Sequence, residues 1–213
     1  MNVLEVKKRI RDLHLNGPDE VKGKPYGQLP SPFDMVPYCR STGGRLNFMF
    51  KNFDFKNKKF LDLGCNAGHY CFALADVGAD GIGVDNDENC ITVANLVKMA
   101  LGYEGVVFEH GDVIDYNHGF YDVIIFLSTF QWIAKMHGTG IAKSFLNDLS
   151  ERAPVMFFET SGSDSKAPLP DADKLSWITQ VLDECGWRVD VMEDLFSEVG
   201  GKRWMIKCLS KKY

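Results

Sequence analysis

One stretch constrains the fold of this chain more than any other, the run Lys-Phe-Leu-Asp-Leu-Gly-Cys-Asn-Ala-Gly-His at residues 59–69. It begins with a short apolar run, continues through a turn bracketed by Gly64 and Gly68, and leads into the start of a helix. Glycine allows positive φ and close backbone approach, which suits a loop that wraps a ligand. A second apolar run at residues 81–85 ends in Asp85. A strand, a glycine turn, a helix and a second strand ending in an acid predict a βαβ nucleotide-binding unit, with the acid where a ribose would lie.

Length and composition indicate one α/β domain with a sizeable core. The chain has 213 residues, of which 45% are hydrophobic and 25% are charged. No apolar run approaches the ~20 residues of a membrane helix, and residues 1–15 are charged and amphipathic, unlike a signal peptide. The six cysteines are scattered without a C-x-x-C pair, which predicts reduced thiols in a cytoplasmic protein. We expect no metal site, because His110, His118 and His137 are isolated in the sequence.

Charge is distributed unevenly along the chain. The total is −5, which argues against broad non-specific affinity for nucleic acid. Residues 1–59 hold 12 Lys and Arg against 6 Asp and Glu, a net of +6, so the remainder carries −11. This basic N-terminal part could face an anionic substrate, or it could be a solvated helix face followed by a flexible arm.

Apolar periodicity and turn residues predict alternating strands and helices, hence a largely parallel sheet with helices on both faces. Residues 18–38 hold five of the eight prolines and predict an irregular, lid-like segment. We therefore expect an N-terminal helix and lid-like segment at 1–44 and a main domain at 45–213. Helices are predicted at 3–15, 41–53, 69–76, 89–101, 140–149 and 172–185, and strands at 60–63, 81–85, 106–110, 121–127, 155–159, 187–192 and 203–209.

The glycine pattern also distinguishes between nucleotides. A dinucleotide site requires G-x-G-x-x-G, which the run from Gly64 to Gly68 does not match. With Asp62 at the end of the first strand, the run instead resembles motif I, D-x-G-x-x-x-G, of the class I S-adenosylmethionine-dependent methyltransferases. The resemblance extends from about Arg45 to the C-terminus. It implies a Rossmann-like sheet of seven strands, the last two forming an antiparallel edge, with S-adenosylmethionine as the methyl donor.

Ligands of such sheets bind beyond the carboxyl ends of the strands, and this rule selects the residues of the cofactor site. A carboxylate at Asp85 can accept both ribose hydroxyls, and Asp62 should lie near the donor's ammonium group. Asp112 matches the family's adenine-amine acceptor, although a helix cap or turn is its alternative role. Arg45 could pair with the donor's carboxylate or be a surface arginine. The full predicted set is Arg45, Asp62, Gly64, Asn66, Gly68, Asp85, Asn86, Asp112, Val113, Leu127 and Ser128.

Residues 127–133, Leu-Ser-Thr-Phe-Gln-Trp-Ile, follow the predicted fourth strand and bear on the methyl acceptor. They are not N-P-P-Y, and the chain has no Pro-Cys pair, so methylation of nucleobase amino groups or of cytosine C5 is disfavoured. Residues 62–69 look like the D-L-G-C-N-x-G-H of the bicoid-interacting-protein family, which methylates terminal phosphates of RNA. Residues 127–138 are similar to the phosphate methyltransferases that terminate bacterial O-antigen. Both resemblances imply methylation of a phosphate oxygen.

The chemistry of the acceptor decides which side chains are needed. A phosphate oxygen is already anionic and needs cations and donors that orient it, whereas a neutral hydroxyl needs a base. We therefore expect a methyltransferase that acts on a phosphate or hydroxyl oxygen of a small or saccharide-like acceptor, and no membrane partner. The alternatives are an RNA-end or tRNA-modifying methyltransferase and a non-catalytic S-adenosylmethionine-binding partner module. The predicted catalytic residues are His69, Gln131, His137, Arg40 and Tyr26.

Overall fold

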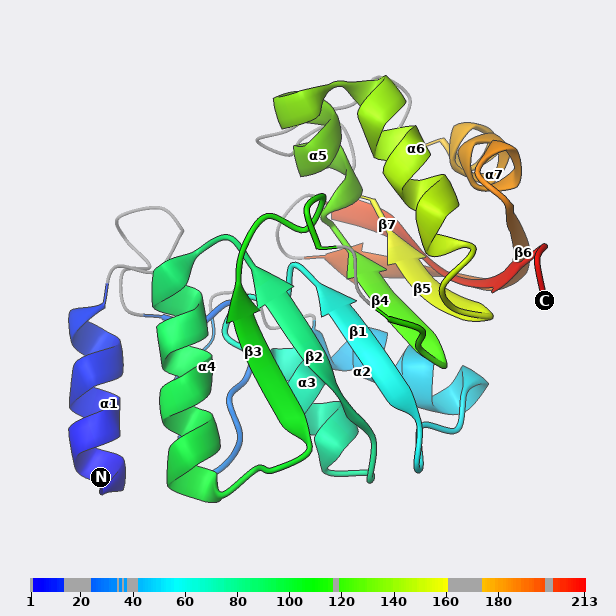
Figure 1. Cartoon of the computed structure of the whole chain (residues 1–213). Helices are drawn as coiled ribbons and strands as arrows, with labels where there is room; N and C mark the ends of the chain where they lie inside the picture. Colours follow the sequence, from blue (N-terminus) through cyan, green and yellow to red (C-terminus); the bar gives the residue numbers. More distant parts are fainter. Residues whose placement is uncertain are drawn as a thin grey trace.

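A seven-stranded sheet forms the centre of the computed structural model, which describes residues 2–13, 24–33, 35, 37, 42–116, 119–160, 174–197 and 201–213 (Figure 1). The strands are β1 (Lys59–Leu63), β2 (Asp80–Asp85), β3 (Val106–His110), β4 (Val123–Leu127), β5 (Val155–Glu159), β6 (Trp187–Ser197) and β7 (Gly201–Ser210). Their order across the sheet is β3-β2-β1-β4-β5-β7-β6. The first five are parallel, while β7 pairs antiparallel with both β5 and β6. This confirms the mostly parallel sheet with an antiparallel edge.

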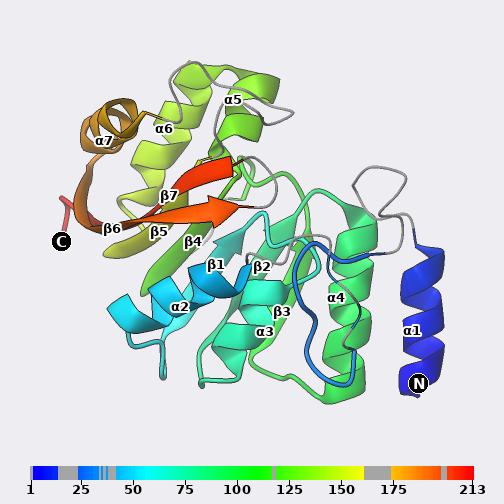
Figure 2. The ribbon, with the colours of Figure 1, turned by 180° about the vertical axis from the view of Figure 1, so that it is seen from behind.

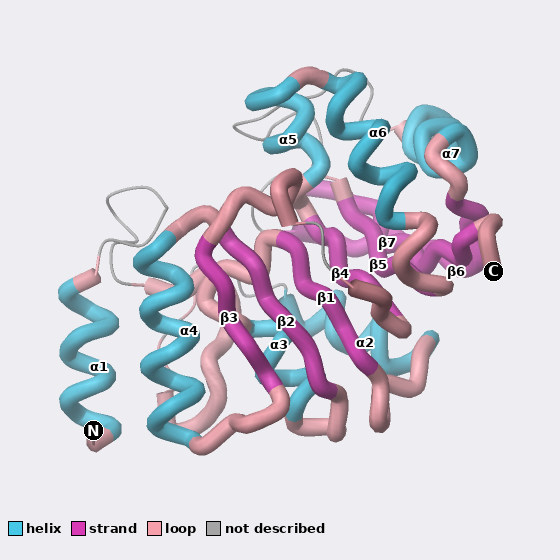
Figure 3. The backbone as a smooth tube through the Cα atoms, in the orientation of Figure 1, coloured by secondary structure: helices cyan, strands magenta, loops and turns pink. Residues whose placement is uncertain are grey.

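Helices cover both faces of the sheet (Figure 3). Along β4, Val123 and Ile125 pack into one core and Ile124 and Phe126 into the other, because successive strand residues point to opposite faces. The first core contains residues of α1 to α4 and the second contains residues of α5 to α7. No helix in the described ranges is long and apolar enough to span a membrane. The helices are α1 (Val3–Asp12), α2 (Thr42–Asn52), α3 (His69–Ala75), α4 (Glu88–Leu101), α5 (Phe130–His137), α6 (Thr139–Leu149) and α7 (Leu175–Glu184).

The N-terminal part adds a second layer to the first core. Helix α1 begins with a capping box between Asn2 and Glu5 and packs beside α4. Residues 24–33, called the strap below, bring Leu29 and Phe33 into the same core. Figure 2 shows the strap, in blue, on the side nearest the viewer, where it crosses in front of α4 beside α3. The strap is therefore a packed part of the fold, and the predicted division at residues 44 and 45 stays a prediction, with α2 running across it.

The structure differs from the sequence-based expectation mainly around the second core. Residues 130–137 form a helix, α5, that was not predicted, although Phe130, Ile133 and Ala134 follow the i, i+3, i+4 spacing and are buried. Strand β6 continues to Ser197 instead of ending at residue 192. The exposed, acidic residues 193 and 194 look like a strand end in sequence, but an edge strand tolerates charge on its open side.

The topology fixes where a ligand would bind. Strands β1 and β4 are neighbours although two strands separate them in sequence, so the connections leave the sheet in opposite directions at this point. A crevice opens at such a switch point, beyond the carboxyl ends of the strands. The turn after β1, the end of β2 and the end of β4 all lie at this edge.

Candidate functional site

The turn between β1 and α3 is held in a conformation that few residues adopt. Gly64 has φ +84°, and a Cβ at this position would collide with the hydroxyl of Thr129. Asn66 also has positive φ, at +50°, which is uncommon for a residue with a side chain. Its side-chain oxygen accepts a hydrogen bond from the Ala67 N–H at 2.8 Å, which supports this local geometry. The turn is therefore shaped by its own residues and by Thr129.

The carboxylate of Asp85 ties this turn to the next helix. One oxygen accepts the Asn66 N–H at 2.8 Å and the other accepts the Asp87 N–H at 2.9 Å. Burial raises the pKa of Asp85, and these two N–H groups oppose the rise. Each oxygen accepts one N–H, and a carboxylate oxygen can accept a second hydrogen bond. The residue thus fits a pair of ribose hydroxyls, and its predicted role stays a prediction.

Asp62 lies beneath the turn and is 2% exposed. Burial raises its pKa to about 7, the Cys71 thiol that donates to it at 3.3 Å opposes the rise, and the charge of Asp85 adds to it. The carboxyl group therefore keeps its proton to a higher pH than a solvated aspartate does. A cation such as an ammonium group placed beside it would stabilise the ionised form.

The other predicted cofactor residues gather near the end of β3. One oxygen of Asp112 accepts the Ile114 N–H at 3.2 Å, as in an aspartate turn, and the other lies 3.4 Å from His137 Nε2. The backbone carbonyl of Asn86 lies 3.2 Å from His110 Nε2, and Val113 is buried in the second core. His137 therefore lies beside Asp112, and its predicted catalytic role stays a prediction.

A buried charge cluster occupies the ends of β4 and β5. Glu159 accepts hydrogen bonds from Arg45 Nε at 2.6 Å and from Arg45 Nη2 at 3.0 Å, which together make a bidentate pair. It also accepts a hydrogen bond from Arg203 Nη1 at 3.1 Å. Ser128 donates to the same carboxylate at 2.6 Å and accepts from Arg203 at 2.8 Å. Arg45, Glu159 and Arg203 are 3%, 0% and 5% exposed. Two of the five guanidinium N–H groups of Arg45 are thus committed to Glu159, which was not expected from the sequence.

Electrostatics keeps this cluster charged. Burial alone would lower the pKa of Arg45, but the Glu159 carboxylate, with smaller contributions from Tyr70 and Tyr26, raises the pKa of Arg45 above its usual value. Burial alone would also raise the pKa of Glu159, but Arg45 and Arg203 bring it below its usual value. Arg45 Nη1 is buried and has no hydrogen-bond partner in the described parts of the chain.

The strap meets the start of α3 at His69. Its Nδ1 lies 2.6 Å from the Gln28 carbonyl oxygen, so this nitrogen carries the proton and Nε2 of the neutral ring holds a lone pair. Nε2 is buried and makes no hydrogen bond to any described residue. Burial lowers the pKa of His69, the Gln28 contact opposes this, and Arg45 adds to the lowering, so the neutral form is favoured. Gly27 packs on the ring, because a Cβ there would lie 2.5 Å from His69 Cγ.

Two further predicted residues lie near the end of β4, and one cannot be placed. Gln131 donates to the Ser128 carbonyl oxygen at 2.6 Å, while its own side-chain oxygen is buried without a partner among the described residues. Leu127 is half-buried and packs on the first core. Arg40 lies outside the described residues. Sequence reasoning missed Glu159 and Arg203, although a charged residue ending an otherwise apolar strand was a usable signal for Glu159.

Comparison with known proteins identifies this architecture. Residues 54–151 match the family model described as a methyltransferase domain. The chain contains a methyltransferase domain. Its fold resembles that of magnesium protoporphyrin IX methyltransferase from Synechocystis PCC 6803, solved with bound S-adenosylmethionine. That likeness has a TM-score of 0.66 and 17% identity, and it covers 99% of this chain and 100% of that one. The Rossmann-like fold expected for the domain is thereby confirmed.

Two other relatives share parts of this methyltransferase domain. The ubiquinone biosynthesis O-methyltransferase of Aromatoleum aromaticum is 32% identical over 74 residues, covering 35% of this chain and 28% of that protein. The O-antigen chain terminator bifunctional methyltransferase/kinase WbdD of Escherichia coli is 25% identical over 131 residues, covering 57% of this chain and 18% of that protein. A solved WbdD structure has a TM-score of 0.74 and 21% identity, and it covers 97% of this chain and 47% of that one. The chain spans under a third of these relatives' sequences.

Proposed function

We propose that the protein transfers a methyl group from S-adenosylmethionine to an oxygen atom of a small or saccharide-like acceptor. The observation that carries the proposal is the strained turn 64–68 of the methyltransferase domain, held by Asp85 at the switch point of the sheet. The relative named as an O-methyltransferase supports an oxygen acceptor, and the relative named as an O-antigen chain terminator supports a saccharide-like one. They leave open whether that oxygen belongs to a phosphate or to a hydroxyl.

The donor supplies an activated methyl group on a sulfonium, so the protein mainly has to bind and orient both reactants. In this proposal Asp85 accepts the ribose hydroxyls and Asp62 faces the amino-acid ammonium. Asp112 has an oxygen near His137 that would face the adenine amine. The turn residues Gly64 and Asn66 bring backbone rather than side chains against the ligand.

His69 is the side chain best prepared to take a proton from an acceptor. Its proton is fixed on Nδ1 by the Gln28 carbonyl, and its Nε2 lone pair is buried and unused. As the acceptor oxygen bonds to the methyl carbon and the carbon–sulfur bond breaks, the O–H proton would move to Nε2. A fully ionised phosphate oxygen needs no such step.

The test combines binding and turnover. Calorimetry should show S-adenosylmethionine binding, and a screen of sugars, phosphorylated sugars, nucleotides and RNA 5′ ends should find one class that yields S-adenosylhomocysteine. With a hydroxyl acceptor, His69→Gln should lower kcat by about 10²–10⁴-fold. His137→Gln should act mainly on donor binding, because His137 contacts Asp112. The wild-type rate should fall with pH only below about 6.5, because the pKa of His69 lies below its usual value. Absence of donor binding would refute the proposal.

An RNA end is a second candidate acceptor. Helix α1 presents the exposed cations Lys8, Arg9 and Arg11, which could hold a phosphate backbone. Methylation of an RNA 5′ end that is lost when these three residues are changed to Gln would favour this candidate. Donor binding without turnover on any class, including when a partner enzyme is added, would instead favour the non-catalytic module.

A further inference from the structure

The last strand in the order of the sheet leaves one edge open. Strand β6 runs over 11 residues, about twice the usual length of a strand, and pairs with β7 on one side only. No described strand pairs with its outer edge. In an antiparallel strand about every second residue turns its N–H and C=O groups away from a given neighbour. The outer edge of β6 is therefore a place where another strand can pair.

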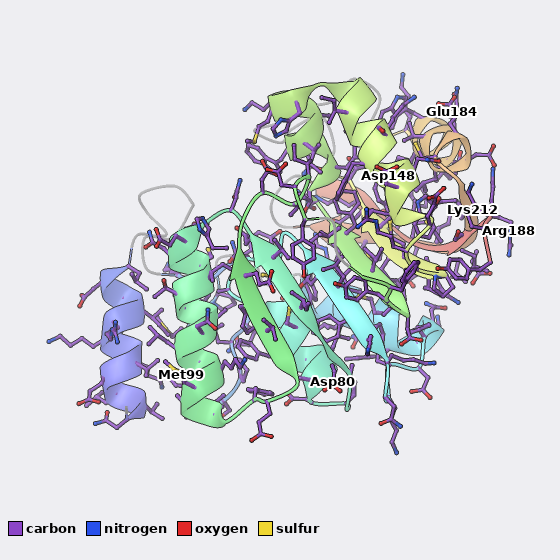
Figure 4. The ribbon with its side chains drawn as sticks, viewed as in Figure 1. Asp80, Met99, Asp148, Glu184, Arg188 and Lys212 are labelled. Carbon is purple, nitrogen blue, oxygen red and sulfur yellow. The ribbon has the colours of Figure 1, made fainter. Side chains whose placement is uncertain are left out.

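The middle of β6 is exposed on both faces of the sheet. Val191 is 36% exposed and Met192 is 38% exposed, and these two neighbours point to opposite faces. Arg188 and Glu193 are exposed as well, and neither forms an ion pair with a described residue. Figure 4 shows Arg188 at the β6 end of the molecule, far from Met99 on α4. A strand that pairs with β6 would thus meet apolar side chains and two charges of opposite sign.

A β-bulge interrupts the alternation of side chains along β6. Val189 lies opposite Cys208 of β7, whereas Val191, two positions further on, lies opposite the adjacent residue Lys207. One residue of β6 is therefore extra, as in a bulge. Directly opposite residues of an antiparallel pair point to the same face. Because Cys208 and Lys207 point to opposite faces, Val189 and Val191 do so too.

The bulge places the two charged side chains on one face. Arg188 and Glu193 both lie opposite residues of β7 that pack in or against the first core, so both point to that side of the sheet. Val189 and Met192 lie opposite residues of β7 in the second core and point to the other side. Without the bulge, residues five positions apart in a strand would point to opposite faces.

Two copies of β6 match each other in this arrangement. A twofold axis perpendicular to the sheet makes the two strands antiparallel and keeps every side chain on its own face, so opposite residues must share a face. The bulge allows this on both of its sides only when the axis passes beside it. One of the two such registers places Arg188 opposite Glu193 of the second copy and Val189 opposite Met192, each pair occurring twice. The other register places Arg188 opposite Val191.

We propose that the outer edge of β6 is a self-association surface, on which two copies of the chain pair their β6 strands antiparallel and join their sheets. The first of the two registers applies, because it neutralises Arg188 and Glu193 across the axis. Charges on an edge strand usually oppose pairing, but here the same strand supplies a cation and an acid at positions that meet. A second copy brings both charges to the matching places, which favours it over an unrelated strand.

Charge reversal tests the register. Sedimentation velocity of the full chain, from micromolar to sub-millimolar concentration, should show a monomer–dimer equilibrium. Arg188→Glu and Glu193→Arg each place like charges opposite one another, so each variant alone should associate at least about tenfold more weakly. An equimolar mixture of the two variants should dimerise again, because each reversed position then meets an opposite charge. The variant with both substitutions should dimerise like the wild type.

The matched control is Asp148→Arg, which changes the net charge as Glu193→Arg does but lies on an exposed position of α6 (Figure 4). It should leave the association unchanged. Three results would overturn the proposal: a wild type that stays monomeric at every concentration, a dimer that persists in both single variants, or single variants that do not associate when mixed.

A measurement on the wild type keeps the proposal testable if a variant does not fold. Backbone amides of residues 188–194 should exchange hydrogen more slowly at high than at low protein concentration, because pairing gives their outward N–H groups acceptors. A dimer without added protection in these residues would assign the contact to another surface. Neither measurement depends on the methyl donor or acceptor, so the outcome leaves the proposed function untouched.

Discussion

Replacing Asp85 by Asn tests the central feature of the site with little change of shape. The carboxylate accepts the Asn66 and Asp87 N–H groups at 2.8 and 2.9 Å, one on each oxygen. An amide has one oxygen, so one of these N–H groups must face an NH₂ group that cannot accept it. Leaving one such group unsatisfied and removing the charge should cost about 1–3 kcal/mol in donor binding, which corresponds to a rise in Kd of roughly 5- to 150-fold.

Calorimetric titration with S-adenosylmethionine measures this effect, and urea unfolding reports the stability of each variant. Asp122→Asn is the matched control, because its carboxylate also accepts a backbone N–H, that of Lys59 at 2.8 Å, but at the amino end of β1. We expect the control to bind the donor like the wild type. A Kd for Asp85→Asn within about twofold of the wild type, a difference under 0.5 kcal/mol, would contradict the ribose assignment. Lower stability with unchanged binding would restrict Asp85 to holding the turn.

Three further predictions concern stability. The pKa of Asp62 is raised in the folded protein from 3.8 to about 7, so the folded state binds more protons than the unfolded state between these pH values. The unfolding free energy should therefore fall by on the order of 4 kcal/mol as pH rises from 3.8 to about 7. Asp62→Asn should flatten this pH dependence, measured by urea unfolding at about pH 4–8. Gly27→Ala should destabilise the fold by about 1–3 kcal/mol, because its Cβ would overlap the His69 ring, and an unchanged urea midpoint would show that the strap does not pack there. Arg203→Met should lower the unfolding free energy by about 1–3 kcal/mol, because Glu159 and Ser128 lose a buried hydrogen-bond donor while Arg45 still neutralises the carboxylate. Lys207 pairs with Asp190 at a more exposed position, so an equally large loss of stability in Lys207→Met would argue against this explanation.

Local patterns were sufficient to predict most of the fold. Strands such as 106–110 and 155–159 were predicted with the bounds that the structure shows, because a short run of apolar residues between turn residues favours a buried strand over other structures. Helix α5 was missed because residues 127–133 were interpreted as an acceptor-binding segment. Their apolar residues repeat at helical spacing, and that signal was available.

The predicted site was less accessible to sequence reasoning than the fold. Asp85 and Gly64 belong to a continuous local pattern, so their neighbours in space follow from their neighbours in the chain. The Arg45 cluster does not, because Glu159 lies 114 residues from Arg45 and Arg203, which also contacts Glu159, lies 158 residues from Arg45, so the three meet only after the whole sheet has formed. Likewise, the contact of Gln28 with His69 depends on how the strap crosses α3, which no periodicity encodes.

The Glu159 carboxylate joins a helix that precedes the first strand to the last strand of the sheet. A protein of this fold that had lost the final hairpin would therefore also lose one of the two cations that neutralise Glu159. We expect evolution to change residues 45, 159 and 203 together: homologues with an apolar residue at 203 should have altered position 45 or 159 as well. An alignment in which these three positions vary independently would show that the cluster is a property of this chain alone.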